Sequence, residues 1–347
     1  MRFYTQQHQY YCGVDLHARS MYVCLLNQAG DVLLHRNLRA TPEAFLQAVA
    51  PYRDALVVAA ECMFTWYWLA DLCAQEGIPF VLGHALYMKA IHGGKAKNDR
   101  IDARKIAILL RGGMLPQAYV YPPAMRATRD LLRRRLHFRR KRAELLAHIQ
   151  HTTSQYNRPG FAKPLTYRAN RTGVVDHFVE PSVQRSMQLD LDLLAHYDGV
   201  LRELDAFILR TATAHDPQTL ARLRSVPGIG KILSLVILYE IQDIARFARP
   251  QQLASYARLV RCTHESAGKI RGAAGRKMGN AHLKWAFSEA AVGFIRLSPG
   301  GKRYYARLER KHGKGKALTV LAHKLARAVY YMWQRDQVFD EVKFLAA

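Results

Sequence analysis

Residues 10–35 read YYCGVDLHARSMYVCLLNQAGDVLLH and contain three apolar runs separated by residues that favour turns. The runs occupy residues 10–14, 21–26 and 32–35. Between the second and third runs, residues 27–30 supply the Asn and Gly that tight turns prefer. Short apolar runs bounded by turn residues are typical of strands, so this stretch predicts three consecutive strands.

The chain then alternates between helical and strand patterns. Thr41 is an N-cap residue ahead of an apolar face formed by Phe45, Leu46 and Val49. The segments that follow are a strand at 55–60, a helix at 66–75, a strand at 78–82, and helices at 85–91 and 101–111. Three strands, a helix, and then alternating strands and helices is the element order of a ribonuclease H-type fold. We therefore expect an α/β domain over residues 1–120.

The middle of the chain, residues 121–218, has a helical pattern. Residues 126–142 hold nine Lys or Arg and a single Asp. Residues 152–181 are rich in Asn, Pro, Gly and basic residues, which favours a loop or a poorly ordered segment. Apolar residues then recur at steps of three and four, as in a coiled-coil seam: Val183, Met187, Leu191, Leu194, Tyr197, Leu201, Leu204 and Ile208. The seam suits a helical hairpin, a dimer contact or a helix packed on its own core.

Residues 219–347 continue the helical pattern, interrupted by many glycines. The fold class expected for the whole chain is therefore α/β plus all-α, with an α/β domain at 1–120, a helical and coiled-coil region at 121–218, and a helical domain at 219–347.

The composition indicates a nucleic-acid-binding protein. The 347 residues carry 52 Lys and Arg against 27 Asp and Glu, a formal net charge of +25. So large an excess of positive charge repels itself unless a polyanion neutralises it. Nucleic acid is the first candidate for this polyanion, and an anionic membrane surface is the second. The N-terminus lacks the apolar run of a signal peptide, and no window is credible as a membrane span. The odd number of cysteines, five, without a CxxC pair, favours reduced thiols in a cytoplasmic protein.

Four acids form a candidate metal site. Asp15 and Glu61 each close an apolar strand, where sites form in parallel α/β sheets. Asp99 and Asp102, three residues apart in KNDRIDARKIAILL, would project from one face of a helix. Oxygen donors without Cys or His suit a hard ion, Mg²⁺ or Mn²⁺, and two such ions can clamp the oxygens of a phosphodiester. The alternative is that Asp99 and Asp102 only stabilise a helix start.

The turn Val226-Pro-Gly-Ile-Gly230 before an apolar helix resembles a helix-hairpin-helix. In such a turn Gly228 and Gly230 would let backbone N–H groups approach a phosphate, and Lys231 would add positive charge. An ordinary turn between two helices explains the same residues equally well.

Residues 263–279, THESAGKIRGAAGRKMG, form a Gly-rich basic segment that we expect to be a flexible loop. Ser266 could act as a nucleophile there if a base or metal activates it and nearby cations stabilise the phosphorane. The cations are Lys269, Arg271, Arg276 and Lys277. A loop serine is more often a hydrogen-bonding residue, and composition alone does not separate the two roles.

The segment GKRYYARLERKHGKGKAL, residues 301–318, is basic and contains paired tyrosines. It would suit phosphate contacts combined with aromatic stacking, or it is a solvated helix face.

Seven motifs in order carry a resemblance to a known family. They are GVDLH, ECMFTWYWLADL, KNDRIDARKIAILLRGG, SVPGIGKILSLVILYEI, LASYARL, ESAGKIRG and KMGNAHLKWA. Together they resemble the DEDD-type insertion-sequence transposases of family one-ten. The resemblance implies a RuvC-like N-terminal domain, a coiled coil and a C-terminal transposase domain. It also implies DNA recombination guided by a structured bridge RNA that pairs with both target and donor DNA.

The resemblance assigns roles to individual residues. Asp15, Glu61, Asp99 and Asp102 would be the DEDD metal ligands, and Ser266 would form a transient phosphoserine link to DNA. Basic residues around the acids, Lys97, Arg100 and Arg104, would contact phosphates. An oligomer, a dimer assembling to a tetramer, is implied because the serine domain of one protomer completes the acidic site of another. Relatives commonly read Ser-Gly, whereas this chain reads Ser266-Ala267-Gly268.

Two other functions remain open from the sequence. A metal-dependent junction nuclease using water would keep the four acids but would not need Ser266. A non-catalytic nucleic-acid-binding scaffold would need only the charge and the turn at 226–230.

Overall fold

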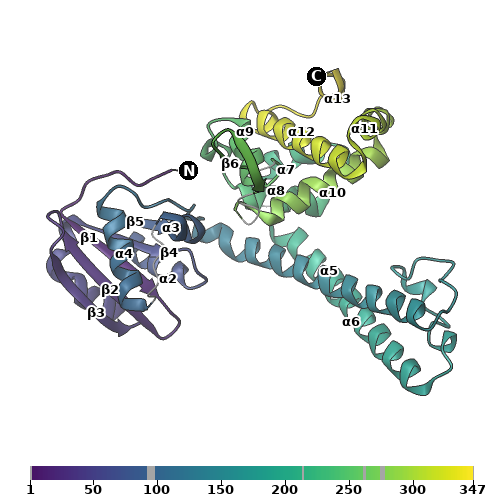
Figure 1. The fold of residues 1–347 in the computed structure, drawn as a ribbon, viewed down its shortest axis with the longest axis horizontal. Helices are drawn as coiled ribbons and strands as arrows, with labels where there is room; N and C mark the ends of the chain where they lie inside the picture. Colours follow the sequence, from purple (N-terminus) through teal and green to yellow (C-terminus); the bar gives the residue numbers. More distant parts are fainter. Residues whose placement is uncertain (1, 92–97, 213–214, 261–262, 274–277, 347) are drawn as a thin grey trace. The chain divides into compact units, whose positions relative to one another are not determined.

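The structure is a computed structural model that describes residues 2–91, 98–212, 215–260, 263–273 and 278–346. The chain divides into two compact units, Met1–Ala124 and Met125–Ala347 (Figure 1). The first unit contains a five-stranded sheet, and the second is mainly helical.

The sheet of the first unit has the strand order β3-β2-β1-β4-β5. The three strands expected from residues 10–35 are β1 (Tyr10–Leu16), β2 (Ser20–Asn27) and β3 (Val32–Arg39), joined antiparallel. The later strands, β4 (Leu56–Glu61) and β5 (Phe80–Gly83), extend the sheet in parallel from β1. This mixed α/β arrangement is consistent with a RuvC-like domain.

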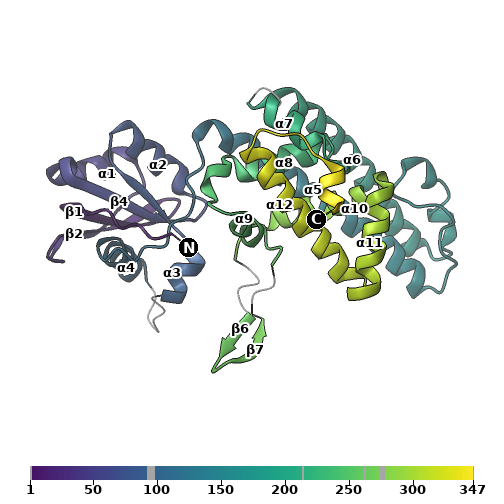
Figure 2. The ribbon, with the colours of Figure 1, turned by 90° about the horizontal axis from the view of Figure 1, so that it is seen from above.

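Helices cover both faces of the sheet (Figure 2). On one face, α1 (Pro42–Val49) and α2 (Trp66–Gln75) pack Phe45 and Leu69 against Val14 and Val58. On the other face lie α3 (Ala85–Ile91) and α4 (Asp99–Arg111), whose apolar side chains pack against alternate residues of β1 and β4. Since side chains alternate along a strand, Gly13 and Asp15 of β1 and Glu61 of β4 belong to the face that α4 covers.

Gly13 allows α4 to lie directly on β1. A Cβ atom at Gly13 would come within 2.3 Å of the Ala103 carbonyl oxygen and 2.4 Å of the Ala107 nitrogen. The residues of α4 at this crossing are themselves small and fully buried. The position of α4, and hence of the acids in its first turn, therefore depends on a residue without a side chain.

In the second unit, α5 (Pro123–Gln155) and α6 (Pro181–Ala212) form an antiparallel helical hairpin (Figure 1). Three ion pairs join the helices at regular intervals: Arg135–Asp205, Arg142–Asp198 at 2.6 Å and His148–Asp190 at 2.5 Å. As residue numbers rise along α5 they fall along α6, which is the signature of antiparallel packing. Of the three arrangements considered for the seam, the helical hairpin is the one present in the chain.

Every seventh residue of the seam is buried: Met187, Leu194, Leu201 and Ile208. Heptad spacing of buried residues matches the knobs-into-holes packing of coiled coils. Between the end of α5 at Gln155 and the start of α6 at Pro181 the chain is a loop with two short 3₁₀ turns, so the loop is the one of the two expectations that is present. Leu165, Val174 and Phe178 form a small core with the distal ends of α5 and α6, and the Arg171–Asp198 ion pair of 2.7 Å fastens the segment to α6.

The rest of the second unit packs seven helices around one core. They are α7 (Pro217–Arg224), α8 (Lys231–Ile241), α9 (Pro250–Tyr256), α10 (Ala281–Leu297), α11 (Pro299–His312), α12 (Lys314–Gln334) and α13 (Glu341–Ala346). The central helix α8 is buried almost all round, in agreement with its continuous apolar sequence.

The flexible loop expected around Ser266 is instead a β-hairpin formed by β6 (Thr263–Ser266) and β7 (Lys269–Ala273). Ala267 and Gly268 form its two-residue turn with φ of 50° and 70°. Positive φ at both positions matches a type I′ turn, whose twist suits two antiparallel strands. The Gly-rich, basic composition predicted a loop, and Ala-Gly is not one of the pairs, Asn-Gly, Asp-Gly or Gly-Gly, that mark a type I′ turn in a sequence.

Two further sequence expectations can be compared with the structure. Within the described residues, no helix has both the length and the apolar character needed to cross a bilayer. Cys12, Cys24 and Cys73 are buried free thiols, whereas Cys62, which directly follows Glu61, is exposed.

We predict that Gly13→Ala destabilises the first unit, because its new methyl group would overlap the backbone of α4. Overpacking of this kind costs about 1–3 kcal/mol. Urea unfolding followed by circular dichroism measures the change. Gly199→Ala in α6 is the matched control, since nothing lies within 4 Å of its Cβ position and alanine favours helix. An unchanged midpoint for Gly13→Ala would contradict the packing role of Gly13.

Candidate active site

Asp15 and Glu61 lie at the same edge of the sheet. In the parallel pairing of β1 with β4, Val14 is opposite Ala60, and the next residues in register are Asp15 and Glu61. Residues opposite each other on neighbouring strands project from the same face. Both carboxylates therefore belong to the face covered by α4, as the strand-end reasoning predicted.

The first turn of α4 brings two more acids to this face. Asn98 caps the helix, its side-chain oxygen accepting a hydrogen bond of 2.8 Å from the Ile101 N–H. Asp99 and Asp102 follow the cap, and the N-terminal end of the helix dipole favours their negative charge. The capping role considered for this stretch thus belongs to Asn98, which leaves both aspartates available to face the sheet.

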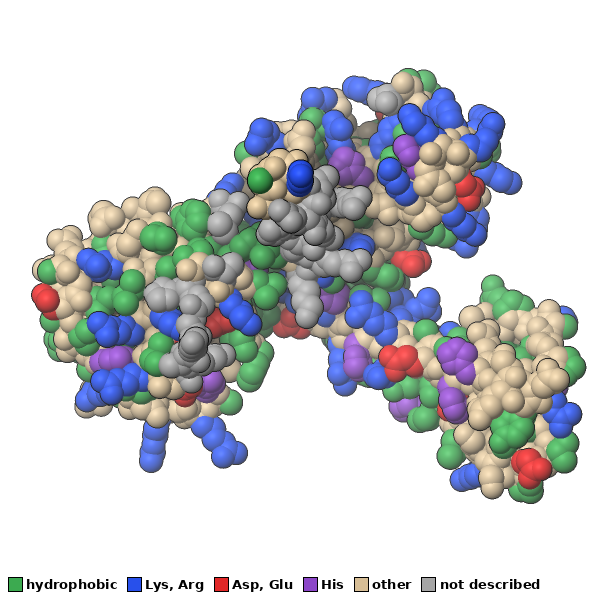
Figure 3. Space-filling view, viewed as in Figure 1, with side chains coloured by type: hydrophobic (Ala, Val, Ile, Leu, Met, Phe, Trp, Pro, Cys, Tyr) green, Lys and Arg blue, Asp and Glu red, His purple; other side chains and the backbone are tan. Residues whose placement is uncertain are grey.

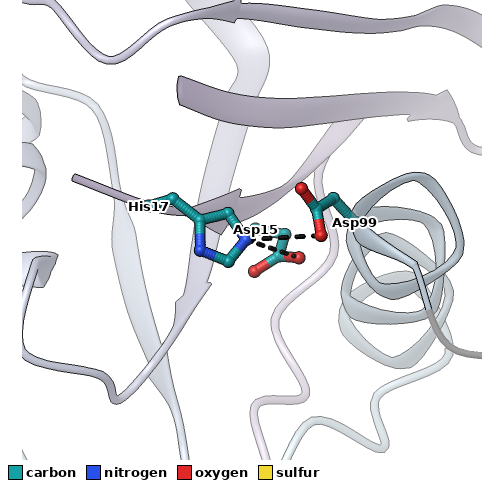
Figure 4. A group of neighbouring side chains, drawn as sticks. All are labelled: Asp15, His17 and Asp99. Carbon is teal, nitrogen blue, oxygen red and sulfur yellow. Dashed lines mark ion pairs between the residues drawn. The ribbon is translucent and has the colours of Figure 1, made fainter. Parts of the chain in front are cut away.

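His17 joins Asp15 and Asp99 in a compact cluster (Figure 4). Its Nε2 atom lies 3.5 Å from Asp15 Oδ2 and 3.4 Å from Asp99 Oδ1. One donor atom from each of the three residues lies within 4.8 Å of the other two. His17 was not expected from the sequence; it directly follows the end of β1, two residues after Asp15.

Burial and neighbouring charges act on the Asp15 carboxyl group. Burial raises the pKa of Asp15, the neighbouring His17 opposes this rise, and the charges of Asp99 and Asp102 add to it. The charged form of Asp15 is thus disfavoured in this position. A bound cation would stabilise that charged form. An acid whose pKa is raised by burial and by neighbouring acids is a candidate member of a functional site.

The four predicted acids do not have identical surroundings. Asp99 is half exposed and pairs with His17, whereas Asp102 is less exposed and lies 3.5 Å from Lys105 Nζ. Glu61 lies at the same strand edge but outside the three-residue cluster. Asp15 and Asp99 are therefore brought together directly, with Asp102 and Glu61 beside them.

The donor set fits a divalent cation. Carboxylate oxygens suit Mg²⁺ and Mn²⁺, and an imidazole nitrogen is accepted by Mn²⁺ more readily than by Mg²⁺. The separations of 3.4–3.5 Å between donor atoms are compatible with a shared ion. Asp15, Asp99 and His17 are the residues that would hold it first.

Three cations were expected to serve this site, and the structure describes two of them. Arg100 and Arg104 are exposed on α4, next to the acids in the chain. Lys97 lies outside the described residues. The exposed arginines are therefore available to a phosphate that approaches this end of the helix.

Ser266 is the last residue of β6, exposed, directly before the two-residue turn of the hairpin. It pairs in register with Lys269, which is also exposed. Ala267 adopts a left-handed conformation that costs an L-residue about 1 kcal/mol or more. Arg271 belongs to β7, whereas Arg276 and Lys277 lie outside the described residues.

The segments on either side of this hairpin are joined by one backbone hydrogen bond and one from a side chain. The Asn280 N–H donates to the Tyr256 carbonyl at 2.5 Å, and Arg258 Nε donates to the Gly279 carbonyl at 2.9 Å. A Cβ at Gly279 would lie 2.5 Å from the same Tyr256 oxygen, so the close approach requires glycine. The chain thus leaves and re-enters the helical core at one fixed point.

A buried carboxylate anchors this point. Glu240 of α8 accepts hydrogen bonds from Arg129 at 3.0 Å, from Arg133 at 2.6 Å and from the Asn280 side chain at 2.7 Å. Burial alone would raise its pKa, but the bonds from Arg133 and Asn280 and the charges of both arginines lower it to about 2. The network joins α5, α8 and the start of α10, and nothing in the sequence pattern indicated it.

The turn before α8 has a packing role that accounts for one of its glycines. A Cβ at Gly228 would lie 2.4 Å from the Phe294 nitrogen and 2.6 Å from the Ala290 oxygen of α10. Gly230 and Lys231 are exposed at the start of α8, with nothing within 4 Å of the Gly230 Cβ position. Of the three predicted phosphate-binding residues, Gly230 and Lys231 remain accessible.

Two family models of transposases match this chain, one in its N-terminal half and one in its C-terminal half. Residues 12–158 match a family model described as a transposase of the DEDD type found in IS110 elements. Residues 220–306 match the model of the transposase IS116/IS110/IS902 family. The chain belongs to the IS110 family of transposases. The first match spans Asp15, Glu61, Asp99 and Asp102, and the second spans Ser266.

Two relatives show how the similarity is distributed. The transposase for insertion sequence element IS1111A of Coxiella burnetii is 22% identical over 94% of this chain and 90% of its own length. A 43.6 kDa protein of the IS110 insertion element of Streptomyces coelicolor is 32% identical over 42% of this chain and 35% of its own length. This transposase therefore shares nearly its whole extent with one relative and a shorter segment with the other.

We predict that Mn²⁺ raises the thermal midpoint of this transposase and that Asp15→Asn abolishes the rise, since a ligand stabilises the state that binds it. His17→Ala should weaken Mn²⁺ binding more than Mg²⁺ binding, because it removes a nitrogen donor. Isothermal titration with each ion measures both affinities. Asp54→Asn, which changes an exposed carboxylate of the same unit, is the control and should change neither affinity. Equal loss for the two ions in His17→Ala would exclude direct ligation.

We predict that Glu240→Gln destabilises the second unit by about 3 kcal/mol, as expected when one partner of a buried ion pair is neutralised. Because the folded-state pKa is depressed, the stabilisation is complete above the unfolded value near 4.5 and is lost as the pH falls toward 2. Denaturant unfolding of both proteins across this range measures the difference. Glu144→Gln removes an exposed partner of Lys141 and should cost no more than about 0.5 kcal/mol.

Proposed function

We propose that this transposase cuts and rejoins DNA at a composite site made of the acidic cluster and Ser266. The observation that carries the proposal is the convergence of Asp15, Asp99 and His17 between the end of β1 and the start of α4. Asp102 in the first turn of α4 and Glu61 at the end of β4 lie beside this cluster, and in the proposal all four acids serve one site. The exposure of Ser266 at a hairpin tip supports its role as the second component.

The proposed reaction is a transesterification. Ser266 Oγ attacks a phosphorus atom of the DNA backbone, forming an Oγ–P bond while the bond from phosphorus to one sugar oxygen breaks. The serine proton is lost to a base and the departing sugar oxygen takes up a proton. A sugar hydroxyl from another strand then attacks the phosphoserine and releases the serine. Each step exchanges one phosphoester for another, so rejoining needs no external energy source.

Each group in the site has a defined task. A divalent cation held by the acids would polarise the phosphate and stabilise the charge that develops on it. Asp15, Asp99 and His17 fix the donor atoms, while the Asn98 cap fixes the first turn of α4. Arg100, Arg104 and Lys269 would hold neighbouring phosphates and orient the strand.

The family resemblance extends the proposal to the assembly. The serine hairpin of one protomer would complete the acidic site of another, within a tetramer formed from dimers. A structured bridge RNA would pair with target and donor DNA and choose the sites. Strand exchange through a Holliday junction would follow, in the cytoplasm, with Mg²⁺ or Mn²⁺ as cofactor.

A junction nuclease that uses water is the second candidate, and the acidic cluster by itself would serve it equally well. The serine hairpin favours recombination, because a hydrolytic enzyme has no use for an exposed serine on a strained, basic turn. A scaffold without catalysis is disfavoured by the mutual approach of the acids, which costs stability unless they bind a cation.

We predict that the protein, with bridge RNA, labelled DNA and Mg²⁺, forms a covalent adduct that survives a denaturing gel. Ser266→Ala should abolish the adduct because it removes the nucleophile, and Asp102→Asn should abolish it or reduce it at least about 100-fold. Ser154→Ala, at an exposed serine of α5, is the matched control. Cleaved DNA without adduct, equal in wild type and Ser266→Ala, would identify a hydrolytic nuclease instead.

A further inference from the structure

The second unit contains an open groove of about 710 Å³ between α11 and α13. The end of α13 packs closely on the start of α11, since a Cβ at Gly300 would lie 2.4 Å from Leu345 Cδ1. The groove is lined by Gly300, Arg303, Tyr304, Arg307, Arg310, Lys311 and Leu345. Four of its seven lining residues are Arg or Lys.

The four cations lie on one face of α11. Positions 303, 307, 310 and 311 follow the three- and four-residue spacing that brings side chains together on a helix. All four are exposed, and no ion pair with a carboxylate is present for any of them among the described residues. Figure 3 shows Lys and Arg side chains gathered over α11 and the start of α12.

An aromatic ring holds two cations in place at the groove. The Arg307 guanidinium lies 5.2 Å from the centre of the Tyr304 ring, and Lys324 Nζ of α12 lies 4.2 Å from it. The Lys324 ammonium is buried and has no hydrogen-bond partner among the described atoms. Positive charge is thus concentrated at the groove by cation–π contacts rather than neutralised by acids.

The paired tyrosines were expected to stack on nucleic-acid bases, but both make contacts within the protein. The Tyr304 ring already contacts two cations of the protein, Arg307 and Lys324. The Tyr305 hydroxyl donates to the Lys314 carbonyl at 3.2 Å, which joins α11 to the start of α12. Both rings therefore organise the helix surface, and the cations provide the contacts to a ligand.

We propose that this α11 groove binds the sugar–phosphate backbone of a nucleic-acid duplex, separately from the acidic site and the serine hairpin. The proposal rests on the transposase function and adds a positioning surface to it. From Arg303 to Lys311 the helix rises about 12 Å. One strand of a duplex places a phosphate about every 3.4 Å along its axis, so the groove spans about three phosphates. Backbone contacts of this kind position a duplex without reading its sequence.

The test uses the triple variant Arg303→Ala/Arg307→Ala/Arg310→Ala in the full-length Ser266→Ala protein. Binding of a labelled 20-base-pair DNA and of a structured RNA hairpin is measured by fluorescence anisotropy, in EDTA, across a range of salt concentrations. Each lost phosphate contact lowers the slope of log affinity against log salt by about 0.9, so we expect a fall of about 2 to 3. The duplex that shows the fall identifies which nucleic acid occupies the groove.

The matched control is Arg185→Ala/Arg202→Ala/Arg210→Ala, which removes the same charge from exposed positions on α6. An unchanged slope for both nucleic acids, or an equal fall in the control, would overturn the proposal. Unfolding curves establish that each variant is folded. Tyr304→Leu, which keeps every charge, should lower affinity by releasing Arg307, whereas Tyr304→Phe should not. Because EDTA and Ser266→Ala exclude chemistry, this outcome is independent of whether an adduct forms.

Discussion

The close contact between Gly13 of β1 and the backbone of α4 is the constraint on which the first unit depends. Because no side chain separates the strand from the helix, Ala103 and Ala107 of α4 rest directly on the sheet. The first turn of α4 is thereby brought to the end of β1, where Asp15 stands. Packing between small residues thus determines the separation of carboxylates that lie far apart in the sequence.

The same packing concentrates negative charge. Asp15 is partly buried with Asp99 and Asp102 near it, and each neighbour raises its pKa further. Acids that are partly buried and close together lower the stability of the fold relative to acids in water. Active sites commonly have this cost in stability. His17 offsets part of the repulsion through its contacts with Asp15 and Asp99, so it serves the apo protein as well as a metal-bound one.

Much of the first unit was predictable from the sequence, because its strands are short apolar runs with clear turn residues. The strand-end positions of Asp15 and Glu61 and the helical spacing of Asp99 and Asp102 also follow from local pattern. His17 was missed because an exposed histidine after an aspartate has many ordinary roles. Its contact with Asp99 depends on how α4 packs, and no local pattern contains that information.

The second unit was less predictable for the same reason. The seam of α6 was recognised, but its partner became clear only from the ion pairs with α5. Residues 152–181 have a composition typical of disorder, yet Leu165 and Phe178 find partners on α5 and α6. The carboxylate of Glu240 lies within an apolar helix, and its stabilising arginines come from more than a hundred residues earlier.

The α5–α6 hairpin also restricts how this protein can change in length. At about 1.5 Å per residue, the 32 residues of α6 span roughly 48 Å, and the core around Phe178 packs on the N-terminal part of this helix. A single inserted residue would rotate the buried heptad positions by about 100° and separate the charged partners across the helices. The hairpin can therefore lengthen or shorten only when both helices gain or lose about seven residues together. Its length is expected to change in whole heptads.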